Sequence, residues 1–204
     1  MAPSAPAPLY NAHITAGSLL VRESRAIAAL LLQDPTPEQW RQAIIVDNIL
    51  QKSAPSSSMR MATLLRQRLK SMSPEFLEPV VNSSRDVALQ LLLASAIKQS
   101  RILADFMLRI AQARYREFAR QLQRRDWDHF LEECRQLDPT IALWSSSTQN
   151  KMREVVFRIL AEAGYLENSR SCVLQPVSIL PEVRTFLEQH HEFHLLNCLD
   201  ISHE

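Results

Sequence analysis

The stretch SRDVALQLLLASAIKQS, residues 84–100, carries apolar side chains around nearly its whole helical circumference. Its first residue, Ser84, belongs to the types that are preferred at helix N-caps. A helix that is apolar on all sides is buried among other elements. The stretch therefore predicts a central, buried helix, and its expected core residues are Val87, Leu91, Leu92 and Leu93.

Glycine is scarce in the rest of the chain. Only Gly17 and Gly164 occur in 204 residues, whereas average usage would give about fourteen. Folds rich in β-structure need glycine in their turns, so a mainly α fold is expected. The same scarcity excludes the glycine-rich loops that hold phosphate in many nucleotide-dependent enzymes.

Hydropathy and cysteine usage predict a cytoplasmic protein with no membrane segment. The longest apolar run, residues 26–32, is far shorter than the ~20 residues of a membrane-spanning helix. The three cysteines are an odd number without paired spacing, which indicates free thiols in a reducing compartment. The opening MAPSAPAP has the composition of a disordered tail, assigned to residues 1–9.

Helix signals predict a helical N-terminal bundle over residues 10–121. The run TPEQ from Thr36 is a capping box with proline at the first helical position, and it opens a helix through Ile49. Upstream, residues 19–32 show a helical pattern, and the serines of 53–58 precede a helix to about Met72. After the central stretch, residues 98–120 predict one long amphipathic helix.

A different pattern follows over residues 122–204. A helix from Asp126 and a short turn lead to the serines 145–147, which cap a long helix ending at Gly164. Residues 165–179 then read as a β-hairpin, before a closing helix that starts at Pro181. This order resembles a winged helix-turn-helix, so we expect a winged-helix-like region with one small β-hairpin. Such regions also serve as dimerisation or protein-docking modules.

Charge is distributed unevenly along the chain. Residues 41–125 contain 15 basic and 6 acidic residues, whereas residues 126–204 contain 6 basic and 13 acidic residues. Arginine, which forks onto phosphate with two hydrogen bonds, makes up 19 of the 23 cations. The simpler alternative is that these charges cover solvated helix faces.

Nucleic-acid contacts are expected from an arginine-rich stripe on the helix over 98–120, from its basic flanks, and from the outward face of the helix that follows the serines. The stripe consists of Lys98, Arg101, Arg109, Arg116 and Arg120. Its flanks are Arg60, Arg66, Arg124 and Arg125. The outward face supplies Ser147, Asn150, Lys151 and Arg158, and Arg170 lies at the predicted wing tip.

Catalytic and metal-binding patterns are weak. His190, His194 and Cys198 share one helical face, but their setting among glutamates near the end of the chain favours a solvated helix end over a zinc site. The sequence has no Ser–His–Asp order and no metalloprotease helix. We therefore predict a protein that is not an enzyme and that needs no cofactor and no metal.

Four separated segments together resemble one family. They are NAHITAGSLLVRESRAIAALLL (11–32), WRQAIIVDNILQ (40–51), RDWDHFLEECR (125–135) and VVFRILAEAGYLE (155–167). In content, order and spacing they look like the BrxA family of the BREX (bacteriophage exclusion) defence systems. The resemblance implies a helical, DNA-binding protein, similar to the RNA-binding antitermination factor NusB. It further implies that this protein acts beside a methyltransferase, a phosphatase-like protein and ATPases, and it supplies no catalytic residues.

We therefore expect a DNA-binding accessory protein of a phage-defence system. Phosphate contacts should outweigh contacts to base edges, because few side chains suited to reading bases are present, so binding to double-stranded DNA should show little sequence preference. Two alternatives remain. One is a scaffold that docks other BREX proteins through its charge asymmetry, and the other is RNA binding through the helical half.

Overall fold

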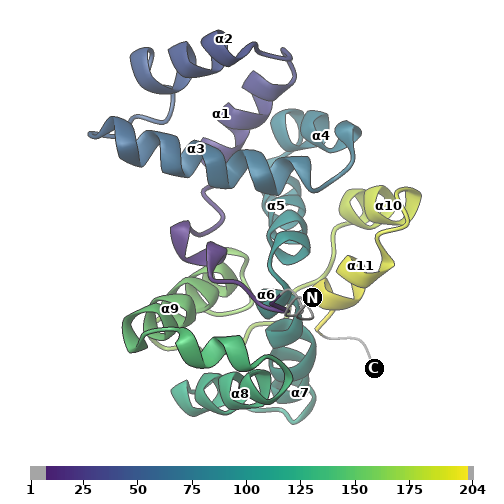
Figure 1. The fold of residues 1–204 in the computed structure, drawn as a ribbon. Helices are drawn as coiled ribbons and strands as arrows, with labels where there is room; N and C mark the ends of the chain where they lie inside the picture. The colour runs from purple at the N-terminus through teal and green to yellow at the C-terminus, as the bar shows by residue number, and fades with distance from the viewer. Residues whose placement is uncertain (1–7, 202–204) are drawn as a thin grey trace, which may run out of the picture.

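The computed structural model describes residues 8–201, and this part of the chain is mainly helical (Figure 1). The predicted tail over residues 1–9 lies almost entirely outside the described residues. The α-helices are α1 (Val21–Leu31), α2 (Pro37–Arg41), α3 (Pro55–Lys70), α4 (Leu77–Asn82), α5 (Arg85–Gln99), α6 (Arg101–Phe106), α7 (Gln112–Arg116), α8 (Arg124–Leu137), α9 (Ser146–Glu162), α10 (Pro181–Gln189) and α11 (Phe193–Leu199). Short 3-10 segments are η1 (His13–Ala16), η3 (Pro74–Phe76) and η5 (Pro139–Leu143), and π-helical turns are η2 (Gln42–Val46) and η4 (Met107–Ala111).

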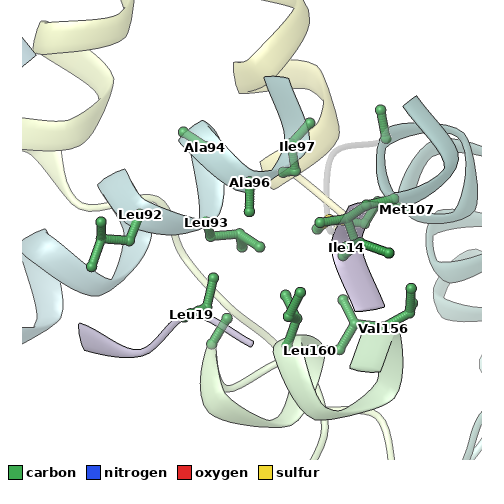
Figure 2. Packing of buried hydrophobic residues seen from close by; sticks show 14 of the residues in the cluster. Ile14, Leu19, Leu92, Leu93, Ala94, Ala96, Ile97, Met107, Val156 and Leu160 are labelled. Atoms are coloured by element: carbon green, nitrogen blue, oxygen red, sulfur yellow. The ribbon is translucent and has the colours of Figure 1, made fainter. Parts of the chain in front are cut away.

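The predicted central helix is confirmed as α5. The Ser84 hydroxyl accepts a hydrogen bond from the Val87 amide at 3.3 Å and so caps its first turn. In Figure 1, α5 lies between the upper group α1–α4 and the lower group α6–α9. Its buried leucines and alanines meet Leu19 from the N-terminal segment and Leu160 from α9 (Figure 2). Burial on all sides therefore places this helix at the centre of the core.

Two buried glutamines hold the C-terminal segments against the central helices. Gln90 of α5 donates to the Ser178 carbonyl and accepts from the Leu180 amide, both at 2.9 Å. Gln112 of α7 donates to the carbonyls of Asn197 and Asp200, at 2.6 and 3.1 Å. Since an unpaired buried amide is costly, these bonds fix how α10 and α11 approach the core.

Several predicted helix ends are confirmed. Thr36 and Gln39 form the capping box, with 2.8 Å from the Thr36 amide to the Gln39 side chain. Ser145 caps α9 by accepting from the Thr148 amide at 3.2 Å. Gly164 follows α9 with a φ of 84°, a left-handed conformation that favours glycine.

The single helix expected over residues 98–120 is wrong. Ser100 has an extended ψ of 95° and ends α5, and the axis of the following helix differs in direction by 109°. That helix contains the π-turn η4, which shifts the faces of the residues beyond it. It ends after Arg116, because Phe118 adopts a φ of 54°. The stripe residues Lys98 and Arg101 therefore lie on different helices, and Arg120 lies beyond the helix end.

The predicted β-hairpin over residues 165–179 is also wrong, because residues 8–201 contain only isolated β-bridges and no strand. Leu166 pairs with Leu174, and Val173 pairs with Gln121. Asn168 folds the intervening chain into a turn by accepting from two following amides, and Pro176 has no amide hydrogen to extend the pairing. The winged-helix assignment, which depended on that hairpin, is not supported.

Aromatic side chains from both sides of the predicted domain boundary at 121/122 pack together. The division into two domains stays a prediction. The ring of Phe106 lies 5.4 Å from that of Trp127, 5.3 Å from Phe130 and 5.8 Å from Phe157. These contacts belong to one continuous apolar core. Within residues 8–201 no single helix is long and apolar enough to cross a membrane, although α5 and the helix after it meet the same criteria as one sharply bent pair.

Candidate nucleic-acid interface

A groove of about 580 Å³ lies between the start of α8, the outer side of α9 and the turn over residues 169–172. Four arginines line it, and we call it the arginine groove: Arg124, Arg153, Arg158 and Arg170. Its other walls include Gln121, Gln123, Glu154 and the edge of the buried Phe157. The groove is thus strongly cationic, with a single carboxylate in its lining.

A second hollow of about 480 Å³ adjoins the arginine groove and shares Gln121 and Gln123 with it. It adds Arg114, Arg120 and Arg125. Its one carboxylate, Asp126, is buried and bound by Arg114. The two hollows together form one arginine-rich surface around the segment that joins α7 to α8.

Most of these cations are not neutralised within the described part of the chain. Five of them have no carboxylate within 4.0 Å among residues 8–201: Arg120, Arg125, Arg153, Arg158 and Arg170. Arg124 lies 3.7 Å from Asp128, and both side chains are more than half exposed, so this pair contributes little. Glu154 faces Lys151 at 3.6 Å. The surface therefore keeps a net positive charge that is available to an anion.

Backbone bonds hold the segment between α7 and α8 against the turn that carries Arg170. The Leu122 amide donates to the Cys172 carbonyl, and the Leu174 amide donates to the Arg120 carbonyl, both at 3.0 Å. The Asn168 side chain accepts from the Arg170 and Ser171 amides at 2.9 and 2.8 Å. Arg120 and Arg170 thus project from backbone that is fixed on both sides.

The base of this segment is closed by Arg114 and Asp126. Arg114 donates to Asp126 at 2.7 and 3.2 Å, and Asp126 also accepts from the Gln123 amide at 2.7 Å, which forms the capping box of α8. The hydrogen bond that Arg114 donates to Asp126 raises the pKa of the Arg114 guanidinium above its usual range. The helix was predicted to start at Asp126, whereas it begins at Arg124.

Other predicted site residues lie on α9. Ser147, Asn150 and Lys151 are exposed near its start. Arg158 follows Asn150 by eight residues, which is about 12 Å along the helix axis. One helix thus carries Ser147, Asn150 and Lys151 at one end and Arg158 of the groove near the other.

The structure separates most members of the predicted stripe. Lys98 is ion-paired with Glu192, and Arg109 with Glu133, while Arg101 lies 3.6 Å from Asp105. Arg116 lines a different hollow, which faces α10 and α11. Among the stripe residues, only Arg120 belongs to the arginine-rich surface.

The two predicted site residues of α3 lie apart from this surface, since α3 is in the upper group and α8 and α9 are in the lower group of Figure 1. Arg66 stacks over Trp40 at 4.8 Å, and Arg60 lines a hollow beside η1. Their neighbour Arg68 is buried and donates to the Gly17 and Ser18 carbonyls, so it is structural.

Arg153 is absent from the predicted site residues because only the outward face of α9 was expected to contact nucleic acid. Arg153 is half-buried and lines the groove beside Phe157, one helical turn further along. The i, i+4 spacing of an arginine and an aromatic residue was the available signal. This spacing indicates a groove only once residues 169–172 are known to form the opposite wall.

The fold and the site together define a mainly helical protein that gathers arginines around one groove. The model of the BrxA family matches residues 8–191. A relative from Paramagnetospirillum magneticum (strain ATCC 700264 / AMB-1), named BREX protein BrxA, is 42% identical over 195 residues, which cover 96% of this chain and 98% of the relative. The chain belongs to the BrxA family, whose members are components of BREX phage-defence systems. The resemblance seen in the sequence is thereby confirmed.

Two further comparisons agree with this result. A BREX protein BrxA from Escherichia coli O9:H4 (strain HS) is 33% identical over 184 residues, covering 90% of this chain and 86% of the relative. A crystal structure of a protein from Magnetospirillum magneticum superposes with a TM-score of 0.87 at 41% identity, covering 96% of this chain and all of that one. The helical architecture described above is therefore similar to one found in a crystal.

Proposed function

We propose that this BrxA protein binds DNA in a BREX defence system, and that the arginine-rich surface is its phosphate-binding site. The observation that carries the proposal is the set of five arginines without a carboxylate partner among the described residues, gathered around two adjoining hollows. Guanidinium groups bind phosphate through two parallel hydrogen bonds, and neutralised phosphates release counterions. A polyanion is therefore the ligand that this surface fits best.

Double-stranded DNA of any sequence should bind with similar affinity. Seven arginines line the two hollows, whereas few side chains near the start of α9 are placed for hydrogen bonding with base edges, namely Gln149, Asn150 and Lys151. Phosphate contacts fix position but carry no sequence information. We therefore expect a preference well below the roughly thousandfold that a sequence-specific regulator shows.

The experiment is a competition between ligands at about 150 mM salt. Labelled duplex DNA of random sequence is bound to the protein and displaced by native-sequence duplex, by random duplex or by structured RNA. Similar displacement by both duplexes and weaker displacement by RNA is the expected result. A preference above about a hundredfold for one duplex would contradict weak selectivity, and stronger displacement by RNA would identify RNA as the ligand.

A second candidate function, docking of other BREX proteins, is favoured by two exposed leucines. Leu137 at the end of α8 and Leu143 at the end of η5 are 61% and 84% exposed. Exposed apolar side chains on a polar surface are typical of contact sites when they cluster. Co-purification of BREX partners after nuclease treatment, with Leu137→Ser/Leu143→Ser as the variant, separates direct docking from association through DNA.

A further inference from the structure

Phe118 is the most exposed large apolar side chain among the described residues, at 95%. It lies in the segment between α7 and α8, directly before Ala119 and Arg120, which line the second hollow. A single exposed apolar residue is common on protein surfaces, so exposure alone carries little weight. The backbone conformation and the neighbours of Phe118 indicate that its exposure has a function.

The backbone places Phe118 where glycine is usual. Its φ is 54°, its amide donates to the Tyr115 carbonyl at 3.0 Å, and the Ala119 amide donates to the Arg114 carbonyl at 3.0 Å. These two bonds form the Schellman arrangement at a helix end, whose left-handed residue is most often glycine. Leu20 also has a left-handed φ, of 53°, but its side chain packs against the core. Phe118 thus occupies an unfavourable conformation without gaining burial.

Arginines lie close to Phe118 in the chain, and its acidic neighbour Glu117 is ion-paired with Arg114 at 2.8 Å. Arg120 follows Phe118 by two residues and lines the second hollow together with Arg125 of α8, and this hollow adjoins the arginine groove. The Arg114–Asp126 pair closes the base of that segment, and the bonds of Leu122 and Leu174 anchor its far end. The ring is therefore held outward on an ordered support beside the arginines that suit phosphates.

We propose that Phe118 stacks on a nucleobase of the nucleic acid whose phosphates the arginine-rich surface holds. This inference rests on the proposed function. Proteins that hold a phosphate backbone with arginines commonly stack aromatic rings on unpaired bases or insert apolar wedges between base steps. The favoured ligand is DNA with unpaired or unstacked bases, because a paired and stacked base offers its face to no side chain.

The test compares two short duplexes that differ only in a central bubble of mismatched bases. Wild-type protein should bind the bubble more tightly than the fully paired duplex. Phe118→Ala should lose roughly five- to a hundredfold in affinity for the bubble, as expected for one stacked base. Its salt dependence should stay unchanged, since no cation is removed. Phe118→Trp should bind like the wild type, and Phe118→Leu like the alanine variant, because leucine has no aromatic face.

Controls separate stacking from other effects. Phe193→Ala, which removes another exposed ring at 55% exposure, should bind both duplexes like the wild type. Phe118→Gly removes the ring and should raise the unfolding midpoint by about 2 to 4 °C, because glycine suits the left-handed conformation. Weaker binding of the bubble by this stabilised variant would therefore reflect the lost ring and not misfolding.

Two results would overturn the inference while leaving DNA binding intact. The first is Phe118→Ala binding the bubble like the wild type while Arg120→Ala/Arg158→Ala/Arg170→Ala loses affinity. The second is Phe118→Leu retaining full affinity, which would indicate an apolar wedge between base steps instead of aromatic stacking. If the wild type binds neither DNA, the proposed function fails and the stacking inference fails with it.

Discussion

Arg114 and Asp126 join the end of α7 to the start of α8 through hydrogen bonds of 2.7 and 3.2 Å. The Asp126 side chain is 2% exposed, whereas that of Arg114 is 37% exposed. The segment between them carries Phe118 and Arg120, so this pair sets the geometry of the arginine-rich surface from beneath. A buried carboxylate that receives several donors is costly to leave unpaired, which makes the contact a sensitive point of the fold.

Replacing Arg114 by Ala should lower the free energy of unfolding by about 1–3 kcal/mol. The Asp126 carboxylate would then stay buried with only the Gln123 amide as a hydrogen-bond donor among its present partners. Urea unfolding measures the change. Arg125→Ala, whose side chain is exposed nearby, is the matched control and should change stability by less than about 0.5 kcal/mol. Equal effects of both variants would show that the pair does not support the segment.

Asp138 should make stability depend on pH at the acidic end. Its carboxylate accepts from the Thr140 hydroxyl at 2.6 Å and from the Tyr10 amide at 2.9 Å. The hydrogen bond from the Thr140 hydroxyl, together with bonds from backbone amides that include that of Tyr10, lowers the pKa of Asp138, although burial acts to raise it. Its stabilising contribution is therefore fully present above the unfolded-state pKa of about 3.9, and it is lost as the pH falls through the lower folded-state value.

The matching variant is Asp138→Asn, which should be about 1–2 kcal/mol less stable than the wild type near pH 7. That gap should shrink as the pH is lowered below about 4, because the wild-type carboxyl then becomes neutral as well. Asp34→Asn, at an exposed loop position, controls for the loss of one charge. A gap that stays constant down to about pH 2 would contradict the assignment.

Replacing Arg68 should lower stability much more than replacing Arg66, although both residues lie on α3. Arg68 is 3% exposed, and burial lowers its pKa to about 10. Arg68→Met should cost about 2–4 kcal/mol of stability, since the carbonyls of Gly17 and Ser18 lose their donor. Arg66→Ala should cost about 0.5–1 kcal/mol, the value of an exposed cation–π contact. Urea unfolding tests both variants, and neither should change the salt dependence of DNA binding.

The parts of the fold that were predictable from sequence are those governed by local chemistry. Ser84, Ser145 and Gly164 act at helix ends through bonds to residues three or four positions away, and the sequence shows such spacings directly. The apolar run of α5 likewise requires burial wherever it lies in the chain. These features do not depend on distant partners.

The parts that were not predictable depend on distant partners. Ser100 ends α5 although serine is no strong helix breaker, and its burial ties the bend to the surrounding packing. Lys98 is neutralised by Glu192, which is 94 residues away. The helical pattern around Lys98 contains no sign of this partner, so Lys98 was predicted to be free to bind phosphate. Residues 172–174 pair with the segment after α7 as well as with Leu166, so no two-stranded hairpin forms, and this pairing completes the groove.

The central claim is that phosphates bind the arginine-rich surface and not the arginines of α2, α3 and the start of α5. Its most direct test is the salt dependence of duplex affinity for two matched triple variants. Arg120→Ala/Arg158→Ala/Arg170→Ala should lower the slope of log affinity against log salt by about three units, close to one for each phosphate that is no longer neutralised. Arg41→Ala/Arg60→Ala/Arg85→Ala, which removes the same charge from α2, α3 and the start of α5, should leave the slope unchanged. An unchanged slope for the first variant, or an equal decrease for the second, would contradict the claim.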